Sequence, residues 1–87
     1  MISDTKSFKT IQATKELGQI IREIRKSKGL TIQAVSGLAN TSPRFLSELE
    51  RGKETAEIGK VLKVLRTLGL DIAIKDRSSQ PVRGREK

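Results

Sequence analysis

Residues 31–52, TIQAVSGLANTSPRFLSELERG, place the tightest limit on what this chain can fold into. They predict two short helices joined by a tight turn, because Ser42 is a good N-cap, Pro43 suits the first helical position and Gly52 provides a C-terminal stop. Asn40 tolerates the left-handed backbone that such a turn needs. Polar side chains near the start of the second helix stay exposed. The pattern is typical of a helix that reads the major groove of DNA, although an ordinary αα-hairpin would share it.

Apolar residues recur at helical spacing on both sides of this stretch and predict a further helix on each side. The preceding helix is expected to have Thr14 as its N-cap and to end at Gly29, with Arg25 on its solvent face. The following helix is expected to begin after a cap at Thr55 and to end at Gly69. The residues expected to face the core are Leu17, Ile20, Ile21, Ile24, Val35, Leu38, Phe45, Leu46, Leu49, Ile58, Val61, Leu62, Leu65 and Leu68.

Residues 70–75, LDIAIK, change the period from helical to two, which places Leu70, Ile72 and Ile74 on one side of a predicted strand. An isolated strand is not stable, and no other part of the chain clearly predicts one. The simplest solution is pairing with the same strand of a second copy in a two-fold dimer. The alternative is an extended tail packed on the core.

Composition limits the class of protein. The 87 residues suit one small domain, expected over residues 14–75 between a flexible arm (1–13) and a disordered basic tail (76–87). The net charge of +8, half of it outside residues 14–74, favours a polyanionic partner. The chain has no Cys and no His, so we expect no enzyme activity, metal or cofactor. Without a long apolar run or a signal peptide, a cytoplasmic, nucleoid-associated protein is expected, with no membrane partner.

With these elements placed, residues 14–74 resemble the Cro/C1-type (Xre) helix-turn-helix family. The resemblance implies an all-α, four- to five-helix, lambda-repressor-like domain, here with a short C-terminal β-strand pairing across a dimer. The terminal strand is similar to that of the HipB-type antitoxin branch, which implies a kinase-like toxin as partner. The fragments that carry the resemblance are Gly29-Leu30-Thr31, Ser42, Leu46, Leu49, Glu50-Arg51-Gly52 and Leu68-Gly69-Leu70.

Most candidate DNA contacts lie on or beside the helix predicted to begin at Pro43. For base reading we expect Arg44 first, because Arg pairs bidentately with guanine, then Ser47, and then Glu48 as an acceptor from cytosine. For Glu48 an ion pair within the chain is the stronger alternative. Ile32 stands where many members carry a phosphate-bracing Gln, and Pro43 stands at a frequent base-reading position, so specificity should rest mainly on Arg44 and Ser47. The residues expected at phosphates, through side chains or helix N-termini, are Thr31, Gln33, Ser42, Lys28 and Lys53.

The sequence therefore predicts a dimeric, sequence-specific DNA-binding repressor of a palindromic operator. The resemblance further implies the antitoxin of a HipA-like toxin–antitoxin operon that autoregulates its promoter. Two alternatives remain open. One is a protein-interaction module on the same fold, and the other is a stand-alone regulator without a toxin partner.

Overall fold

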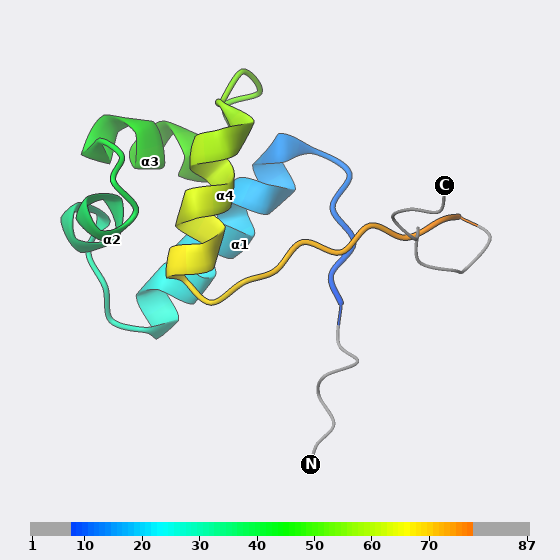
Figure 1. Ribbon diagram of the computed structural model, residues 1–87, viewed down its shortest axis with the longest axis horizontal. Helices are drawn as coiled ribbons and strands as arrows, with labels where there is room; N and C mark the ends of the chain where they lie inside the picture. Colours follow the sequence, from blue (N-terminus) through cyan, green and yellow to red (C-terminus); the bar gives the residue numbers. More distant parts are fainter. Residues whose placement is uncertain (1–7, 78–87) are drawn as a thin grey trace, which may run out of the picture.

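The computed structural model describes residues 8–77, and within them four helices form the regular structure (Figure 1). In chain order they are α1 (Thr14–Ser27), α2 (Ile32–Leu38), α3 (Pro43–Glu50) and α4 (Ile58–Thr67). Helix α2 packs against both α3 and α4, while α1 packs against α3. The predicted pair of helices joined by a tight turn is therefore α2 and α3. The flanking helices pack against this pair, α1 against α3 and α4 against α2.

Local signals set the ends of α2 and α3 as the sequence predicts. The hydroxyl oxygen of Thr31 accepts a hydrogen bond from the Ala34 N–H at 3.0 Å. The Ser42 hydroxyl accepts one from the Phe45 N–H at 2.9 Å, with Pro43 in the first turn of α3. Asn40 adopts the left-handed backbone in the turn, with a φ of 58°. These caps satisfy N–H groups that would otherwise have no partner at the helix ends.

The starts of α1 and α4 differ from the prediction. Thr14 lies inside α1, whose N-cap is Ala13 without a side-chain hydrogen bond. The Thr14 hydroxyl instead donates to the carbonyl oxygen of Gly52 at 2.7 Å, across to the end of α3. Helix α4 begins at Ile58 after Glu57, so Thr55 is not its cap. At the start of α1 a tertiary contact of the Thr14 hydroxyl replaces the expected cap, which the capping pattern alone does not reveal.

An aliphatic core joins all four helices. Part of the expected core is wrong: Leu38 and Ile58 are 72% and 65% exposed, and Leu62 is exposed as well. In α2 the buried row runs from Val35 to Ala39 at a spacing of four, which turns Leu38 outward. In α4, Ile58 is the first helical residue, and the buried residues of the helix begin one turn later at Val61. The buried apolar residues are Ile21, Val35, Ala39, Leu46, Leu49, Val61, Val64, Leu65 and Leu68.

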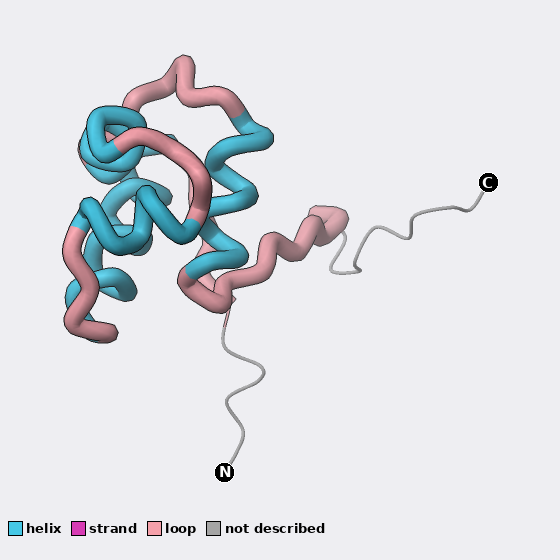
Figure 2. The backbone as a smooth tube through the Cα atoms, turned by 60° about the vertical axis from the view of Figure 1, so that its left-hand side comes forward, coloured by secondary structure: helices cyan, strands magenta, loops and turns pink. Residues whose placement is uncertain are grey.

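The predicted strand over residues 70–75 is not formed in this chain. Leu70 is half-buried against the core. The segment then leaves the helices as extended chain (Figure 2). Ile72 and Ile74 are exposed along it. Residues 8–77 contain no β-strand, and Lys75 forms an isolated bridge. A strand needs the backbone of a partner edge, and within residues 8–77 no such edge pairs with residues 70–75.

The two ends of the chain were expected to be a flexible arm and a disordered tail. Residues 1–7 and 78–87 lie outside the described residues, and residues 8–13 are exposed without regular structure. Within residues 8–77, no helix has the length and apolar character needed to cross a membrane.

Candidate nucleic-acid interface

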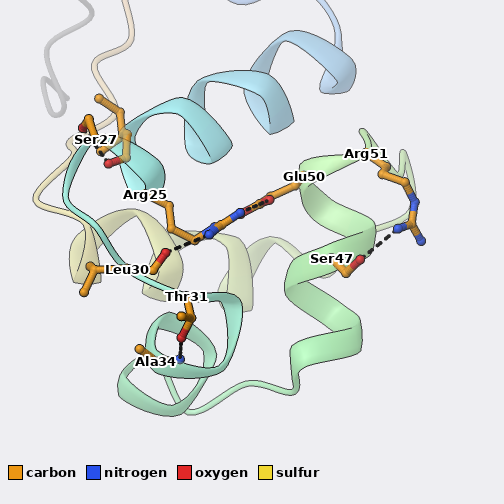
Figure 3. Close-up of polar contacts among 9 residues, drawn as sticks. Arg25, Ser27, Leu30, Thr31, Ala34, Ser47, Glu50 and Arg51 are labelled. Atoms are coloured by element: carbon orange, nitrogen blue, oxygen red, sulfur yellow. Dashed lines mark hydrogen bonds and ion pairs between the residues drawn. The ribbon is translucent and has the colours of Figure 1, made fainter.

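The outer face of α3 carries a row of polar side chains that form two separate hydrogen-bonded groups. The Glu48 carboxylate accepts from Arg44 Nε at 3.2 Å through Oε2 and from Lys53 Nζ at 3.0 Å through Oε1. One turn away, Arg51 Nη1 donates to Ser47 Oγ at 2.8 Å (Figure 3). The three predicted base-reading residues therefore lie together on α3, and Lys53 joins them from the loop that follows.

The charges in this row differ in how far they reach into solvent. The side chain of Arg44 is 87% exposed, whereas that of Glu48 is 24% exposed. The hydrogen bond from Lys53, followed by that from Arg44, lowers the pKa of Glu48 below its usual value, so this residue is an anion at neutral pH. Both oxygens of Glu48 are engaged within the chain, which favours the intramolecular alternative over cytosine reading. Base reading by Arg44 and Ser47 stays a prediction.

The residues predicted at phosphates lie at several helix ends. Thr31 and Ser42 are the N-caps of α2 and α3, so their hydroxyl oxygens already hold one helix N–H each. The other N–H groups of these first turns give each helix end a partial positive charge. Gln33 is exposed in the first turn of α2, and Lys28 is the exposed C-cap of α1. The geometry suits anion contacts at the starts of α2 and α3, while Lys28 belongs to the end of α1.

An open groove between α1 and α3 adds cations that the sequence analysis missed. Lys15 and Arg22 line it from α1, Ser47 lies on the α3 side with Arg51 just beyond the helix end, and Ile32 borders it from the start of α2. The spacing of seven residues between Lys15 and Arg22 places both on one face of α1, and that spacing was the available signal. The wall that α1 contributes also carries the Glu23 carboxylate beside these two cations, so its charge is mixed with a positive excess.

A buried ion pair fixes the base of this groove. Arg25 Nε donates to Glu50 Oε2 at 2.6 Å and Nη2 donates to Oε1 at 3.1 Å, while Nη1 donates to the Leu30 carbonyl at 2.8 Å (Figure 3). The two side chains are 9% and 5% exposed. The hydrogen bond to Glu50 raises the pKa of Arg25 against the opposing effect of burial. The expectation of a solvent-facing Arg25 is therefore wrong; its position one turn after buried Ile21 was the signal.

Backbone contact between α1 and the end of α3 completes this junction. A Cβ added to Gly18 would lie 2.3 Å from the Leu49 carbonyl oxygen and 2.6 Å from that of Glu50. Gly52, with a φ of 90°, approaches Lys15 so closely that an added Cβ would lie 2.7 Å from its Cα. Helix α3 is thus held against α1 by backbone contact and by an ion pair, so its exposed polar row has a fixed orientation.

Comparisons with known proteins agree with this geometry. Residues 18–73 match the family model described as a helix-turn-helix domain. The chain is 44% identical over 66 residues to y4mF of Sinorhizobium fredii, named an uncharacterised HTH-type transcriptional regulator, across 76% of this chain and 87% of that protein. It is 30% identical over 57 residues to the HTH-type transcriptional regulator DdrOP3 of Deinococcus deserti, across 66% of this chain and 44% of that protein.

Solved structures share the fold. A chain of the HipA–HipB–O2–O3 complex superposes with a TM-score of 0.75 at 18% identity, covering 80% of this chain and 99% of that one. A chain of the HipB–O4 20mer complex gives a TM-score of 0.74 at 18% identity, over 80% and 99%. The restriction-modification controller protein C.AhdI of Aeromonas hydrophila gives 0.61 at 26% identity, over 67% and 88%.

Proposed function

The chain belongs to the helix-turn-helix family of transcriptional regulators, and from this premise we propose that it is a sequence-specific DNA-binding repressor. The observation that carries the proposal is the polar row of α3, in which the Arg44 side chain is 87% exposed on a helix held by the Arg25–Glu50 pair. A rigid helix that presents an Arg fork is suited to guanine in the major groove. Base-reading residues must be held in place by the fold, and the α1–α3 junction does this.

In this proposal α3 lies in the major groove, with Arg44 pairing to a guanine and Ser47 as the second base contact. The N–H groups at the starts of α2 and α3 bind phosphates, with Thr31, Gln33 and Ser42 at those ends and with Lys28 and Lys53 as further cations. Lys15 and Arg22 in the α1 groove extend the basic surface beyond these positions. Phosphate contacts supply affinity and orientation, while the base contacts supply specificity.

We propose a two-fold dimer in which residues 70–75 pair with their copy. Support comes from self-complementarity in the sequence. An antiparallel pairing centred on Ala73 places Asp71 opposite the partner's Lys75 and Ile72 opposite the partner's Ile74. Ile72 and Ile74 are 52% and 69% exposed in the single chain, so this pairing would bury apolar surface and match opposite charges. Such a dimer would bind a palindromic operator with half-sites about 34–36 Å apart, or a multiple of that distance.

We extend the proposal to an antitoxin role with a kinase-like toxin as partner. The support is the fold shared with chains of the HipA–HipB and HipB–operator complexes. Co-expression with the product of the adjacent gene tests it. A stable complex that binds the shared promoter is the expected result, whereas a repressor that copurifies with no neighbouring product is a stand-alone regulator.

DNA binding is tested by fluorescence anisotropy on fragments from upstream of the gene. We expect saturable, salt-sensitive binding to one fragment. Arg44→Ala should weaken it by about 1–3 kcal/mol and relax preference at one base position. Arg66→Ala is the matched control, because it removes a cation from the last turn of α4. Absence of salt-sensitive binding to every fragment would refute the function, and an Arg44 variant that behaves like the control would refute the assignment of the reading residue.

A further inference from the structure

Glu48 is the acidic centre of the reading surface. Its carboxylate lies between Arg44 and Lys53, at 3.2 Å and 3.0 Å, so each oxygen holds one cation. The three side chains together carry one net positive charge instead of the two that the cations alone would carry. Each oxygen already accepts one charge-assisted hydrogen bond and the side chain is 24% exposed, so a base would have to compete with Arg44 and Lys53 for this carboxylate.

The hydrogen bond to Glu48 leaves the other nitrogen atoms of Arg44 available to contact a base. Nε is the donor to Glu48, and the two Nη groups make no hydrogen bond within residues 8–77. Because Arg44 is 87% exposed, the outer edge of its guanidinium faces solvent while its inner edge is held from behind. An Arg held this way has fewer rotamers to lose when it meets a guanine, so the contact prepares it for base pairing.

A carboxylate on the reading face also has an unfavourable effect near DNA. Non-specific binding depends on cations neutralising phosphates, and Glu48 both repels phosphates and competes for Arg44 and Lys53. At a cognate site the Arg44–guanine contact offsets this repulsion, but at other sites nothing does. Discrimination between partners often rests on such a repulsive element as well as on attractive contacts.

We propose that Glu48 is a specificity-determining residue that holds Arg44 and Lys53 and suppresses binding to non-cognate DNA, without itself reading a base. The inference rests on the proposed DNA-binding function. It predicts that loss of the carboxylate raises affinity for non-cognate DNA more than affinity for the operator. The expected increase in affinity for non-cognate DNA is about fivefold, the factor for one unit-charge interaction at 4 Å in water.

The experiment compares Glu48→Gln with Glu57→Gln. Glu57 lies before α4 and pairs with Lys60 at 3.7 Å, so its replacement also removes one negative charge but leaves the α3 row intact. Affinities for the bound upstream fragment and for a scrambled duplex are measured by anisotropy over a range of salt concentrations. Circular dichroism melting of both variants establishes that each is folded.

For Glu48→Gln we expect the ratio of operator affinity to scrambled-duplex affinity to fall about fivefold. The slope of log affinity against log salt concentration on the scrambled duplex should steepen by about 0.9 for each additional phosphate that the variant neutralises. Glu57→Gln should leave the ratio unchanged. If Glu48→Gln keeps the wild-type ratio, or lowers both affinities equally, the role assigned to Glu48 is overturned. If the wild-type protein binds no upstream fragment, the proposed function fails instead. If Glu48→Asp, which keeps a carboxylate, has the wild-type ratio of operator affinity to scrambled-duplex affinity, the result supports the need for a negative charge at this position.

Discussion

The buried ion pair between Arg25 and Glu50 gives the sharpest test of how α3 is held. Replacing Glu50 by Gln removes the negative charge with little change in shape and leaves the guanidinium buried without a counter-charge. Loss of one partner from such a pair typically costs about 3–5 kcal/mol. The side chains are 9% and 5% exposed, and three hydrogen bonds meet at Arg25, so this range applies here. We take about 3 kcal/mol, because the amide oxygen of Gln can retain one acceptor.

This loss is large for a small domain. Stabilities of about 5–15 kcal/mol are usual, and each kcal/mol shifts Tm by about 4–8 °C at this size, so Glu50→Gln should lower Tm by roughly 12–24 °C. The assay is urea unfolding and thermal melting by circular dichroism. Glu57→Gln is the matched control, since its pair with Lys60 is exposed and 3.7 Å long, and it should cost less than about 0.5 kcal/mol.

A double replacement separates the charge from the packing. Arg25→Met with Glu50→Leu removes both charges and keeps apolar volume, so it should recover most of the stability lost in Glu50→Gln. A loss below about 1 kcal/mol for Glu50→Gln would refute the reasoning, because an ion pair screened by water loses little when broken. A double variant as unstable as the single one would show that the hydrogen bonds to specific atoms, rather than the unpaired charge, set the cost.

Three further predictions follow from the described residues. Gly18→Ala should lower the free energy of unfolding by about 1–3 kcal/mol, because its Cβ would meet carbonyl oxygens of α3. Gly59→Ala has open space around the new Cβ and should raise the free energy of unfolding by about 0.5 kcal/mol. Urea unfolding of both variants measures the difference. The pKa of Glu48 is lowered in the folded chain by its contacts with Lys53 and Arg44. Its ion pairs therefore stabilise the fold at pH above the usual carboxyl pKa of about 4.3, and this stabilisation is lost as the pH falls through the lowered pKa. A Glu48 pKa at or above about 4.3 in an NMR titration would contradict this. Replacing Ile72 and Ile74 by Asp should convert a dimer to a monomer in sedimentation, and a persistent dimer would exclude the strand pairing.

Local chemistry in the sequence was enough to predict the helix pair. The caps at Thr31 and Ser42, Pro43 in the first turn and the left-handed Asn40 each act within a few residues, so their effect can be read without knowing what surrounds them. The candidate base-reading residues were found in the same way, because exposure near a helix start follows from the spacing of apolar residues. The predicted roles of those residues still await the DNA-binding test.

Tertiary structure decided what connects distant parts of the chain. Arg25 meets Glu50 across 25 positions, and Gly18 is required by carbonyl groups of α3, so the partner of neither residue can be read from its own stretch of sequence. The strand expected from Ile72 and Ile74 needs a partner edge, which residues 8–77 do not supply. The sequence by itself determined the existence of the helices, the ends of α2 and α3 and the polar face of α3, because capping and periodicity are local. The orientation of that face was decided by the fold, because burial and ion pairing depend on residues that become neighbours only after folding.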